Sequence, residues 1–496
     1  MNDAHYIGID IGTQGTKGVL CDINGQVKQT SFVPSKLIYK ACAIYEAPEA
    51  IFDSVLQVIR DLAESSGVDS KTIRAIGIDA QMAGIMGIKK DFSAATPYDS
   101  WLDTRCGSYT ELMEAQAGED AIQHSGGQFI HAHAPKILWW KNEQPEAYKT
   151  IEKFVQPNGY VAGRLCGLSS EEAFMDYTFL HFNLFADNQK CCFREDILKL
   201  FGVDKEKMPR IVSPDTIIGT IFPEFAEFCH LPDSVQVIAG CGDTAASSLG
   251  AGITRAGLAY DVAGTASVFA CGTNQFAPDT KQRTILFSRS VCEGLYLPLA
   301  YISGGGLCLK WYASLVGRSL DELNGMVDPR VKREIPMFIP HFSGRTCPLD
   351  DRVSGAFLGM NAQMQTADLY QAILESIAYE YKSYWEIMRN NGCVSDHTVV
   401  RGVGGGARSS VFSQIKADVL GLTYTVPVKV DSAPVAMALL AAHAVQDRPE
   451  PLQEIFQSRD EVVYLPNREM AAHYQDRAEK YLRLLNTYGA YVQEYV

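Results

Sequence analysis

An aspartate followed by a run of glycine and threonine residues interrupts the first apolar segment of the chain, YIGIDIGTQGTKGVL. Gly12 and Gly15 permit a tight turn whose backbone N–H groups point into one concavity, and Thr13 and Thr16 add hydroxyl donors. Such a concavity suits phosphate oxygens, and Asp10 would supply an oxygen ligand for Mg²⁺ beside a polyphosphate. The alternative is a glycine-rich hairpin with a capping aspartate. The chain has no Gly–Lys–Ser/Thr sequence, so this turn is not a Walker P-loop.

A second segment far downstream, LAYDVAGTASVFACG, has the same order of residue types. An apolar run leads to Asp261, and the turn that follows carries Gly264, Thr265 and Ser267. Two such turns, one in each half, indicate a polyphosphate held by two domains of similar construction. The matching stretch is short, so internal duplication and chance similarity both stay open.

A third acid lies among small residues in AGCGDTAASSLGAG. Asp243 follows a predicted strand, and it could take the proton from a hydroxyl as that oxygen attacks phosphorus. The alternative role is a helix N-cap, because Asp before Thr-Ala-Ala-Ser-Ser starts helices well. The two roles are compatible, since a capping position is also rigid.

Two glycine runs could admit a flat or phosphorylated ligand. Gly404–Gly406 stand between a predicted strand and a predicted helix, and Gly304–Gly306 occur in YISGGGLCLKW. Missing side chains allow close approach of a ligand, but each run could equally be a packing turn. A dinucleotide-binding Rossmann unit is disfavoured because the acid expected about 20 residues further on is missing.

The elements that must position these residues follow an α/β pattern. Residues 6–27 predict a β-hairpin, and the apolar positions after Pro48 predict a helix that stops at Gly67. A strand follows in IRAIGIDAQMAGIMGI, and the later half repeats the order of helix and strand. Pro434 is acceptable in the first turn of a late helix. Alternating helices and strands indicate α/β domains, and we place the boundary between residues 238 and 239.

Composition narrows the class of protein further. A chain of 496 residues should form two or more domains, and its net charge of −14 argues against nucleic-acid binding. Its thirteen cysteines are dispersed, which predicts reduced thiols and no zinc site. We find no signal peptide and no apolar run long enough to span a membrane, so we expect a cytoplasmic protein that does not bind membranes.

Five motifs in one order carry a resemblance that covers Tyr6 to about Ala444: the two turns, WLDTR, GCGDTAASSLGAG and VGGGARSSVFSQIKADVLG. Together they resemble the FGGY carbohydrate kinases. The resemblance implies two ribonuclease-H-like (actin/Hsp70/hexokinase-like) domains with a catalytic cleft between them. Residues 1–238 would bind the sugar and form the first phosphate turn, and residues 239–496 would bind nucleotide and carry the catalytic aspartate. The expected enzyme uses ATP and Mg²⁺, phosphorylates a small sugar, and could be a homodimer.

The resemblance assigns roles residue by residue. Asp243 matches the catalytic base, and Asp10 and Asp243 match the acids that hold Mg²⁺. The residues that match nucleotide-binding positions are Gly12, Thr13 and Gln14 in the first turn, Gly264 and Thr265 in the second, and Gly305, Gly306, Gly405, Gly406 and Ser410 around the adenosine.

The segment AQMAG resembles the Gln-Met-x-Gly of xylulokinase-like members, which implies a pentulose-like substrate. The matching substrate positions are Gln81, Met82, Ala83, Trp101, Asp103, Asp243 and Thr244. Ala83 stands where xylulokinases commonly have His, and Thr244 where they commonly have Asn. These two departures leave ribulose, a tetritol or a glycerol-like polyol open as substrates.

Two histidines in FIHAHAPK bear on the first departure. His131 and His133 could replace the missing His, or they could be a solvated loop pair, and two histidines alone are a poor metal site. A nucleotide-dependent switch of the same superfamily is the alternative function, but it gives no use for AQMAG and WLDTR.

Overall fold

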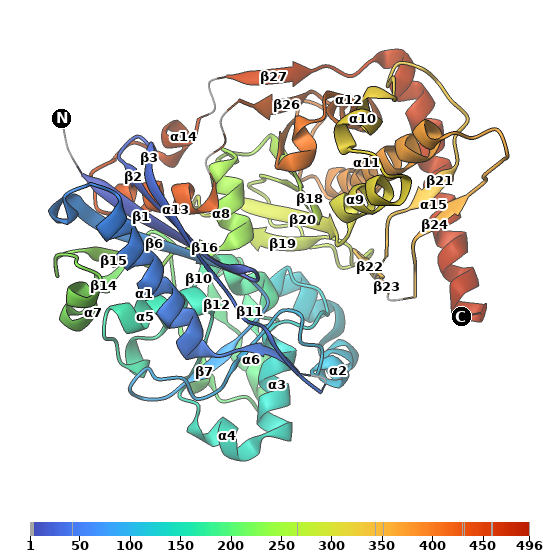
Figure 1. The fold of residues 1–496 in the computed structure, drawn as a ribbon. Helices are drawn as coiled ribbons and strands as arrows, with labels where there is room; N and C mark the ends of the chain where they lie inside the picture. The colour runs from blue at the N-terminus through green and yellow to red at the C-terminus, as the bar shows by residue number, and fades with distance from the viewer. Residues whose placement is uncertain are drawn as a thin grey trace. The chain divides into compact units, whose positions relative to one another are not determined.

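The computed structural model describes residues 4–41, 43–264, 266–342, 344–350, 352–428, 430, 432–457 and 460–495. The chain divides into two compact units (Figure 1). Unit 1 comprises Met1–Thr254, Ser288–Leu295 and Asp431–Gln457, and unit 2 comprises Arg255–Phe287, Tyr296–Val430 and Ser458–Val496. The predicted two-domain α/β organisation is confirmed. Unit 1 runs past the predicted boundary at 238, so Asp243 belongs to it, and it also takes in two later segments.

The main sheet of unit 1 starts with the predicted hairpin. β1 (His5–Gly12) pairs antiparallel with β2 (Gly15–Asp22), which pairs antiparallel with β3 (Val27–Pro34). On its other side β1 runs parallel to β6 (Ile73–Ala80), which is parallel to β15 (Gln236–Ile238) and β16 (Cys241–Gly242). β14 (Ile217–Thr220) closes the edge.

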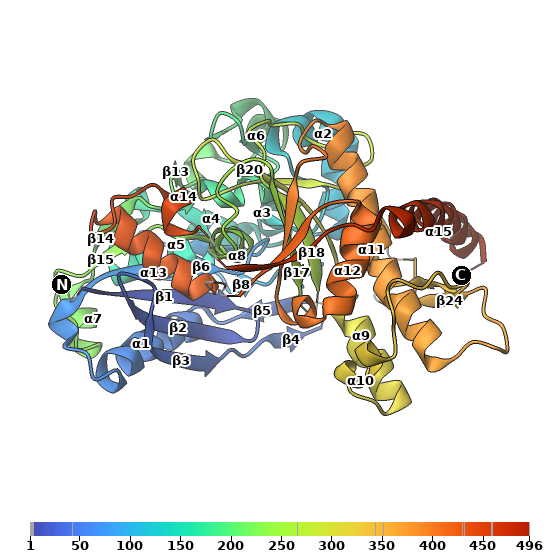
Figure 2. The ribbon, with the colours of Figure 1, turned by 90° about the horizontal axis from the view of Figure 1, so that it is seen from above.

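Two helices cover opposite faces of this sheet. α1 (Pro48–Ser65) begins at Pro48, and the chain leaves it through Gly67 at φ 68°, as predicted. α13 (Ala433–Ala444) lies along β1 and has Pro434 in its first turn (Figure 2). Gly8 and Gly77 are neighbours in the ladder, and a Cβ on Gly8 would lie 1.6 Å from the carbonyl oxygen of Pro434. Glycine at this pair therefore lets the α13 backbone rest directly on the sheet.

Smaller elements complete unit 1. Its helices are α2 (Gly107–Ser125), α3 (His133–Glu143), α4 (Pro145–Thr150), α5 (Pro157–Leu165), α6 (Glu195–Leu200), α7 (Pro223–Phe228), α8 (Asp243–Gly250) and α14 (Leu452–Ile455). Its side sheets pair β4 (Ile38–Lys40), β5 (Ala43–Glu46) and β8 (Tyr98–Asp99); β7 (Met86–Ile88) and β9 (Lys153–Val155); β10 (Phe174–Asp176) and β13 (Arg210–Val212); and β11 (Ala186–Asp187) and β12 (Cys192–Phe193).

The main sheet of unit 2 repeats the pairing pattern of unit 1. β17 (Leu258–Ala263) is antiparallel to β18 (Ser267–Cys271), and β18 is antiparallel to β20 (Tyr296–Ile302). β17 is also parallel to β25 (Val399–Val403), which is parallel to β26 (Tyr424–Pro427). β19 (Leu286–Arg289) and β27 (Glu461–Tyr464) lie at the edges. The likeness of the two turns thus extends to five strands in each sheet.

The helices of unit 2 are α9 (Gly305–Val316), α10 (Leu320–Gly325), α11 (Thr366–Asn390), α12 (Ser410–Leu420) and α15 (Arg468–Tyr495). Two small sheets pair β21 (Met337–Ile339) with β24 (Ala356–Leu358), and β22 (Arg345–Thr346) with β23 (Leu349–Asp350). Among the described residues, no helix is long and apolar enough to cross a membrane. The described cysteines are all free thiols, as their dispersal predicted.

Candidate active site

Three carboxyl groups meet at one edge of the unit 1 sheet. Asp10 lies near the end of β1 and pairs in register with Asp79 near the end of β6. Asp243 follows β16, whose last residue Gly242 pairs with Ala80. Because β1, β6 and β16 are parallel, their carboxyl ends lie at the same edge, where ligands bind in open α/β sheets.

Asp79 was not among the predicted site residues. It is fully buried, and neither of its oxygens accepts a hydrogen bond from the residues that the structure describes. Burial raises its pKa well above the ordinary value, and the charges of Asp10 and Asp243 add to this. A proton on Asp79 lets it lie beside the Asp10 carboxylate without repulsion. Its sequence signal was the one that marked Asp10, an acid inside an apolar strand.

Asp243 is the first residue of α8, so the N-cap is Gly242 and not Asp243 itself. One oxygen of Asp243 accepts hydrogen bonds from the backbone N–H (2.6 Å) and the hydroxyl (3.2 Å) of Thr244. Loss of solvent raises the pKa of Asp243 to about 7, and the Asp10 charge contributes, while the Thr244 bonds oppose the shift. A carboxylate with this pKa can accept a proton near neutral pH.

The predicted sugar and phosphate residues share a continuous chain of hydrogen bonds. Trp101 Nε1 donates to Thr13 Oγ1 (2.9 Å), and Thr13 Oγ1 donates to Gln81 Oε1 (3.3 Å). Gln81 Nε2 donates to the carboxylate of Glu46 (2.7 Å), a residue that the sequence analysis did not single out. We call these four residues the Trp101–Glu46 chain. In the same turn, the backbone oxygen of Gln14 accepts from the N–H of Ser35.

Met82 and Ala83 continue this segment toward Asp243. A Cβ on Gly242 would lie 2.3 Å from Met82 Cε, so Met82 packs against the residue that precedes Asp243. Ala83 has a φ of 63°, a left-handed conformation that is uncommon outside glycine and is concentrated at functional sites.

Asp103 is buried, and its carboxylate is already used inside the protein. Its oxygens accept from Arg105 Nε (2.8 and 3.0 Å) and from the backbone N–H of Ile44 (2.9 Å). It therefore holds the loop that carries Trp101.

Buried polar side chains (Tyr98, His133 and His181) lie near Gly84, where a Cβ would come within 2.1 Å of the Tyr98 hydroxyl. All three are buried: the Tyr98 hydroxyl has no hydrogen-bond partner in the part of the chain that the structure describes, and His133 and His181 reach only the backbone of Gly84 and of Thr178, outside ordinary hydrogen-bond geometry. His133 lies 6.1 Å from Phe179 between ring centroids, and burial lowers the pKa of both imidazoles to about 3. The solvated-loop alternative is therefore wrong for His133. Buried polar groups are usually satisfied, so such a cluster of exceptions is a feature of functional sites.

In unit 2, four of the predicted nucleotide residues line one cavity of about 400 Å³: Gly264, Gly306, Gly405 and Gly406. A Cβ on Gly405 would meet nothing within 4 Å, so the glycine leaves the cavity wall open. Lys310 and Arg408 bring positive charge, and Asn324 and Ser409 add polar groups. The size and this donor set fit a nucleotide. The sequence analysis quoted the segments that contain Lys310 and Arg408 for their glycines and did not single out the two cations, and Asn324 has no motif around it.

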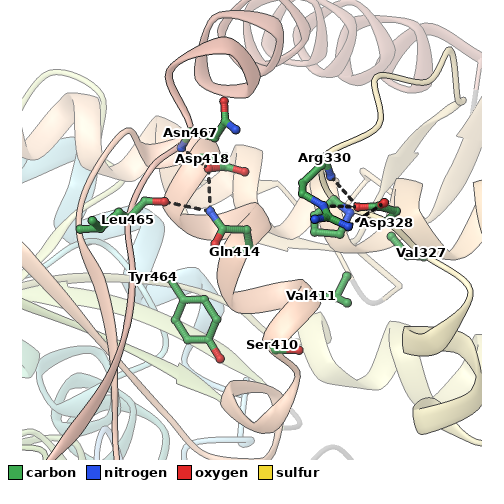
Figure 3. Close-up of a pocket in the computed structure, with 11 residues that line it drawn as sticks. Val327, Asp328, Arg330, Ser410, Val411, Gln414, Asp418, Tyr464, Leu465 and Asn467 are labelled. Carbon is green, nitrogen blue, oxygen red and sulfur yellow. Dashed lines mark hydrogen bonds and ion pairs between the residues drawn. The ribbon is translucent and has the colours of Figure 1, made fainter.

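Two of the predicted unit 2 residues that the structure describes do not line this cavity. A Cβ on Gly305 would lie 2.2 Å from Ser267 Oγ, so Gly305 serves close packing at the start of α9. Ser410 lines a separate cavity of about 600 Å³ whose walls include Gln414 and Tyr464 (Figure 3), while its neighbour Ser409 lines the first. Thr265 lies outside the described residues.

Asp261, the acid of the second turn, is buried in a closed network. It pairs with Lys416 and accepts hydrogen bonds from the hydroxyls of Tyr381 and Tyr424, each at 2.6 Å. All four side chains are buried. The carboxylate of Asp261 is therefore fully hydrogen-bonded within the folded protein.

No group of three or more His, Cys, Asp or Glu side chains in the described residues is arranged to hold a metal ion. Magnesium beside a nucleotide takes one or two carboxylates, with phosphate oxygens and water as the other ligands. Asp10 and Asp243 supply two carboxylates at one sheet edge, so the donor set fits magnesium bound together with a nucleotide.

Comparison with known proteins agrees with this arrangement. Residues 5–250 match the N-terminal domain, and residues 260–445 the C-terminal domain, of the FGGY family of carbohydrate kinases. The xylulose kinase of Escherichia coli is 26% identical over 489 residues, which cover 97% of this chain and 98% of that protein.

Solved structures share the fold over almost the whole length. A ligand-bound xylulose kinase from Lactobacillus acidophilus superposes with a TM-score of 0.90 at 23% identity, covering 99% of this chain and 100% of that one. A gluconate kinase from the same species gives a TM-score of 0.89 at 23% identity, with the same coverage. The two family matches together span most of the residues, and so this chain belongs to the FGGY family of carbohydrate kinases.

Proposed function

We propose that this carbohydrate kinase transfers the γ-phosphoryl group of ATP to a hydroxyl of a pentulose-like sugar. The observation that carries the proposal is the placement of Asp243. It follows Gly242, against which Met82 packs, at the sheet edge where Asp10 also lies. Burial raises the pKa of its carboxyl to about 7. The full-length likeness to a xylulose kinase supports the class of acceptor.

In this proposal, unit 1 binds the sugar. Gln81, Met82, Ala83, Trp101 and Thr244 contact or border it, and Asp243 takes the proton of the attacking hydroxyl. Asp103 acts indirectly by fixing the loop of Trp101.

Unit 2 binds the nucleotide in the cavity lined by Gly306, Gly405 and Gly406. The N–H groups of the two turns, with Gly12, Thr13 and Gln14 in one and Gly264 and Thr265 in the other, bind phosphate oxygens. Asp10 and Asp243 would hold Mg²⁺, which when bound neutralises phosphate charge.

The first test is ADP release with a panel of pentuloses, tetritols, hexuloses, gluconate and glycerol. The panel is broad because Ala83 offers no polar group where xylulokinases commonly have His. Sugar-dependent ADP release with a pentulose as the best acceptor, by kcat/KM, supports the proposal, and a preference for another class of acceptor corrects the substrate.

The second test replaces the proposed base. Asp243→Ala should lower kcat at least ~1,000-fold and leave the nucleotide Kd within about threefold, because proton removal and pre-organised charge are lost while the unit 2 cavity is intact. Asp233→Ala, at an exposed acid of the same unit, is the matched control. Residual turnover above about a tenth of wild type would exclude Asp243 as the base.

A further inference from the structure

The two ends of the Trp101–Glu46 chain determine its direction. An indole N–H can only donate, and at the other end the Glu46 carboxyl accepts from Gln81 Nε2. Trp101 therefore fixes Thr13 Oγ1 as an acceptor, and Glu46 fixes the amide nitrogen of Gln81 on its own side. Between them, the Thr13 hydroxyl donates to Gln81 Oε1. Each group in the chain is left with one orientation.

The backbone around Glu46 is rigid. Glu46 ends β5, where it pairs in register with Tyr98, and α1 begins two residues later at Pro48. Glu46 and Gln81 are both nearly inaccessible to solvent, at 3% and 2%. A buried amide N–H without a hydrogen-bond acceptor costs free energy. The bond from Gln81 to Glu46 therefore fixes the orientation of the Gln81 side chain.

This direction also decides what Gln81 can offer to a ligand. One Nε2 proton is used by Glu46 and the oxygen by Thr13, which leaves the second amide proton as the available donor. A donor at this place selects an oxygen of the acceptor sugar, either carbonyl or hydroxyl.

We propose that Glu46 is a positioning residue that orients the Gln81 amide so that its remaining N–H binds an oxygen of the acceptor sugar, with Thr13 and Trp101 locked in the same chain. This inference rests on the function proposed above and explains how Gln81, a proposed sugar-binding residue of that site, is oriented.

The test is Glu46→Gln, which keeps the volume and removes the acceptor-only end. Gln81 can then turn over, so we expect acceptor kcat/KM to fall about tenfold through KM, with nucleotide KM within twofold. Glu64→Gln is the matched control, because it removes a half-exposed carboxylate that pairs with Arg60 on α1. An acceptor KM that stays within twofold of wild type would overturn the proposal.

The exchanged pair Glu46→Gln/Gln81→Glu separates positioning from packing. In this pair, Thr13 can again donate to the side chain at position 81 and the side chain at position 46 can donate to it. A carboxylate then replaces the free amide N–H that we propose binds the sugar. We expect the exchanged pair to have a higher Tm than Glu46→Gln and an acceptor KM that stays above that of wild type. Wild-type values of both Tm and acceptor KM would show that the N–H is not used.

A readout without turnover makes the inference independent of the proposed reaction. The indole N–H resonance of Trp101 in protein labelled with ¹⁵N-tryptophan, assigned with Trp101→Phe, should shift in Glu46→Gln and not in Glu64→Gln. If no sugar is phosphorylated by the wild type, the proposed function fails, and an unmoved Trp101 resonance would separately overturn the chain.

Discussion

Asp10 and Asp261 occupy the same place in the two sheets, two residues before the pair that closes the hairpin. Asp10 lies opposite Asp79 on its parallel neighbour, whereas Asp261 lies opposite Gly402. A Cβ on Gly402 would lie 2.2 Å from the Tyr424 hydroxyl, so the glycine makes room for the tyrosine that bonds Asp261. The residue on the neighbouring strand thus distinguishes an acid held by the fold from an acid at the sheet edge where we propose the reaction.

The surroundings differ in the same sense. Asp261 is satisfied by Lys416 and two tyrosines, while in unit 1 Asp79 is paired only with another acid, Asp10, and His133 has no hydrogen bond of ordinary geometry among the described residues. A satisfied buried network stabilises a fold, and unsatisfied groups mark a place where stability is given up for binding or chemistry.

The largest expected effect comes from breaking the satisfied network. Asp261→Asn leaves the Lys416 charge buried without its counter-ion, and we expect the free energy of unfolding to fall by about 3–5 kcal/mol in urea titrations. Lys416→Met in the same background should restore part of the loss. Asp476→Asn, which breaks a solvent-exposed pair on α15, should leave unfolding unchanged. Equal effects of the two Asp→Asn variants would contradict the contrast between the hairpins.

The corresponding change in the first hairpin should act on turnover. Asp10→Asn removes a charge that repels Asp243, so we expect unchanged or slightly higher thermal stability together with a kcat about 100-fold lower. Lys17→Ala is the control, because Lys17 faces Asp10 across the hairpin but is exposed. A stability loss as large as that of Asp261→Asn would show that both acids serve the fold.

A smaller effect sharpens the comparison through pH. His133 has a pKa of about 3 in the folded protein and an ordinary value of 6.5, so below pH 6.5 only the unfolded chain binds its proton. The free energy of unfolding should therefore decrease as pH falls from 6.5 toward 3, by up to about 1.4 kcal/mol per pH unit for this residue.

His133→Phe should remove that share, about 1.6 kcal/mol between pH 6.5 and 5, when unfolding is measured across this range. His230→Asn, at an exposed histidine, should leave the slope as it is. An identical slope in His133→Phe would mean that this imidazole is protonated in the folded state.

Several elements of the fold could be predicted from short stretches of sequence. The first hairpin, the start of α1 at Pro48 and its end near Gly67, and Pro434 in the first turn of α13 depend on residues that are neighbours in sequence. The same holds for the glycines that line the unit 2 cavity, since a loop between strand and helix already positions them.

The remaining features depend on distant partners. Lys416 and Tyr424 lie about 160 residues beyond the aspartate they bind, and Glu46 stands in a stretch without a motif. No spacing rule could show that Asp261 is neutralised or that Gln81 is oriented. The assignment of 431–457 to unit 1 is likewise a packing result that local sequence does not contain.

The late return of α13 to the first sheet constrains how the protein is made. Gly8 and Gly77 are uncovered until the backbone of Pro434 and Met437 packs on them, and those residues follow most of unit 2 in the chain. During translation, the face of β1 and β6 that α13 covers therefore stays exposed until α13 has been synthesised, and chaperones can bind to it. A fragment cut after the N-terminal family domain would keep that face open and should aggregate.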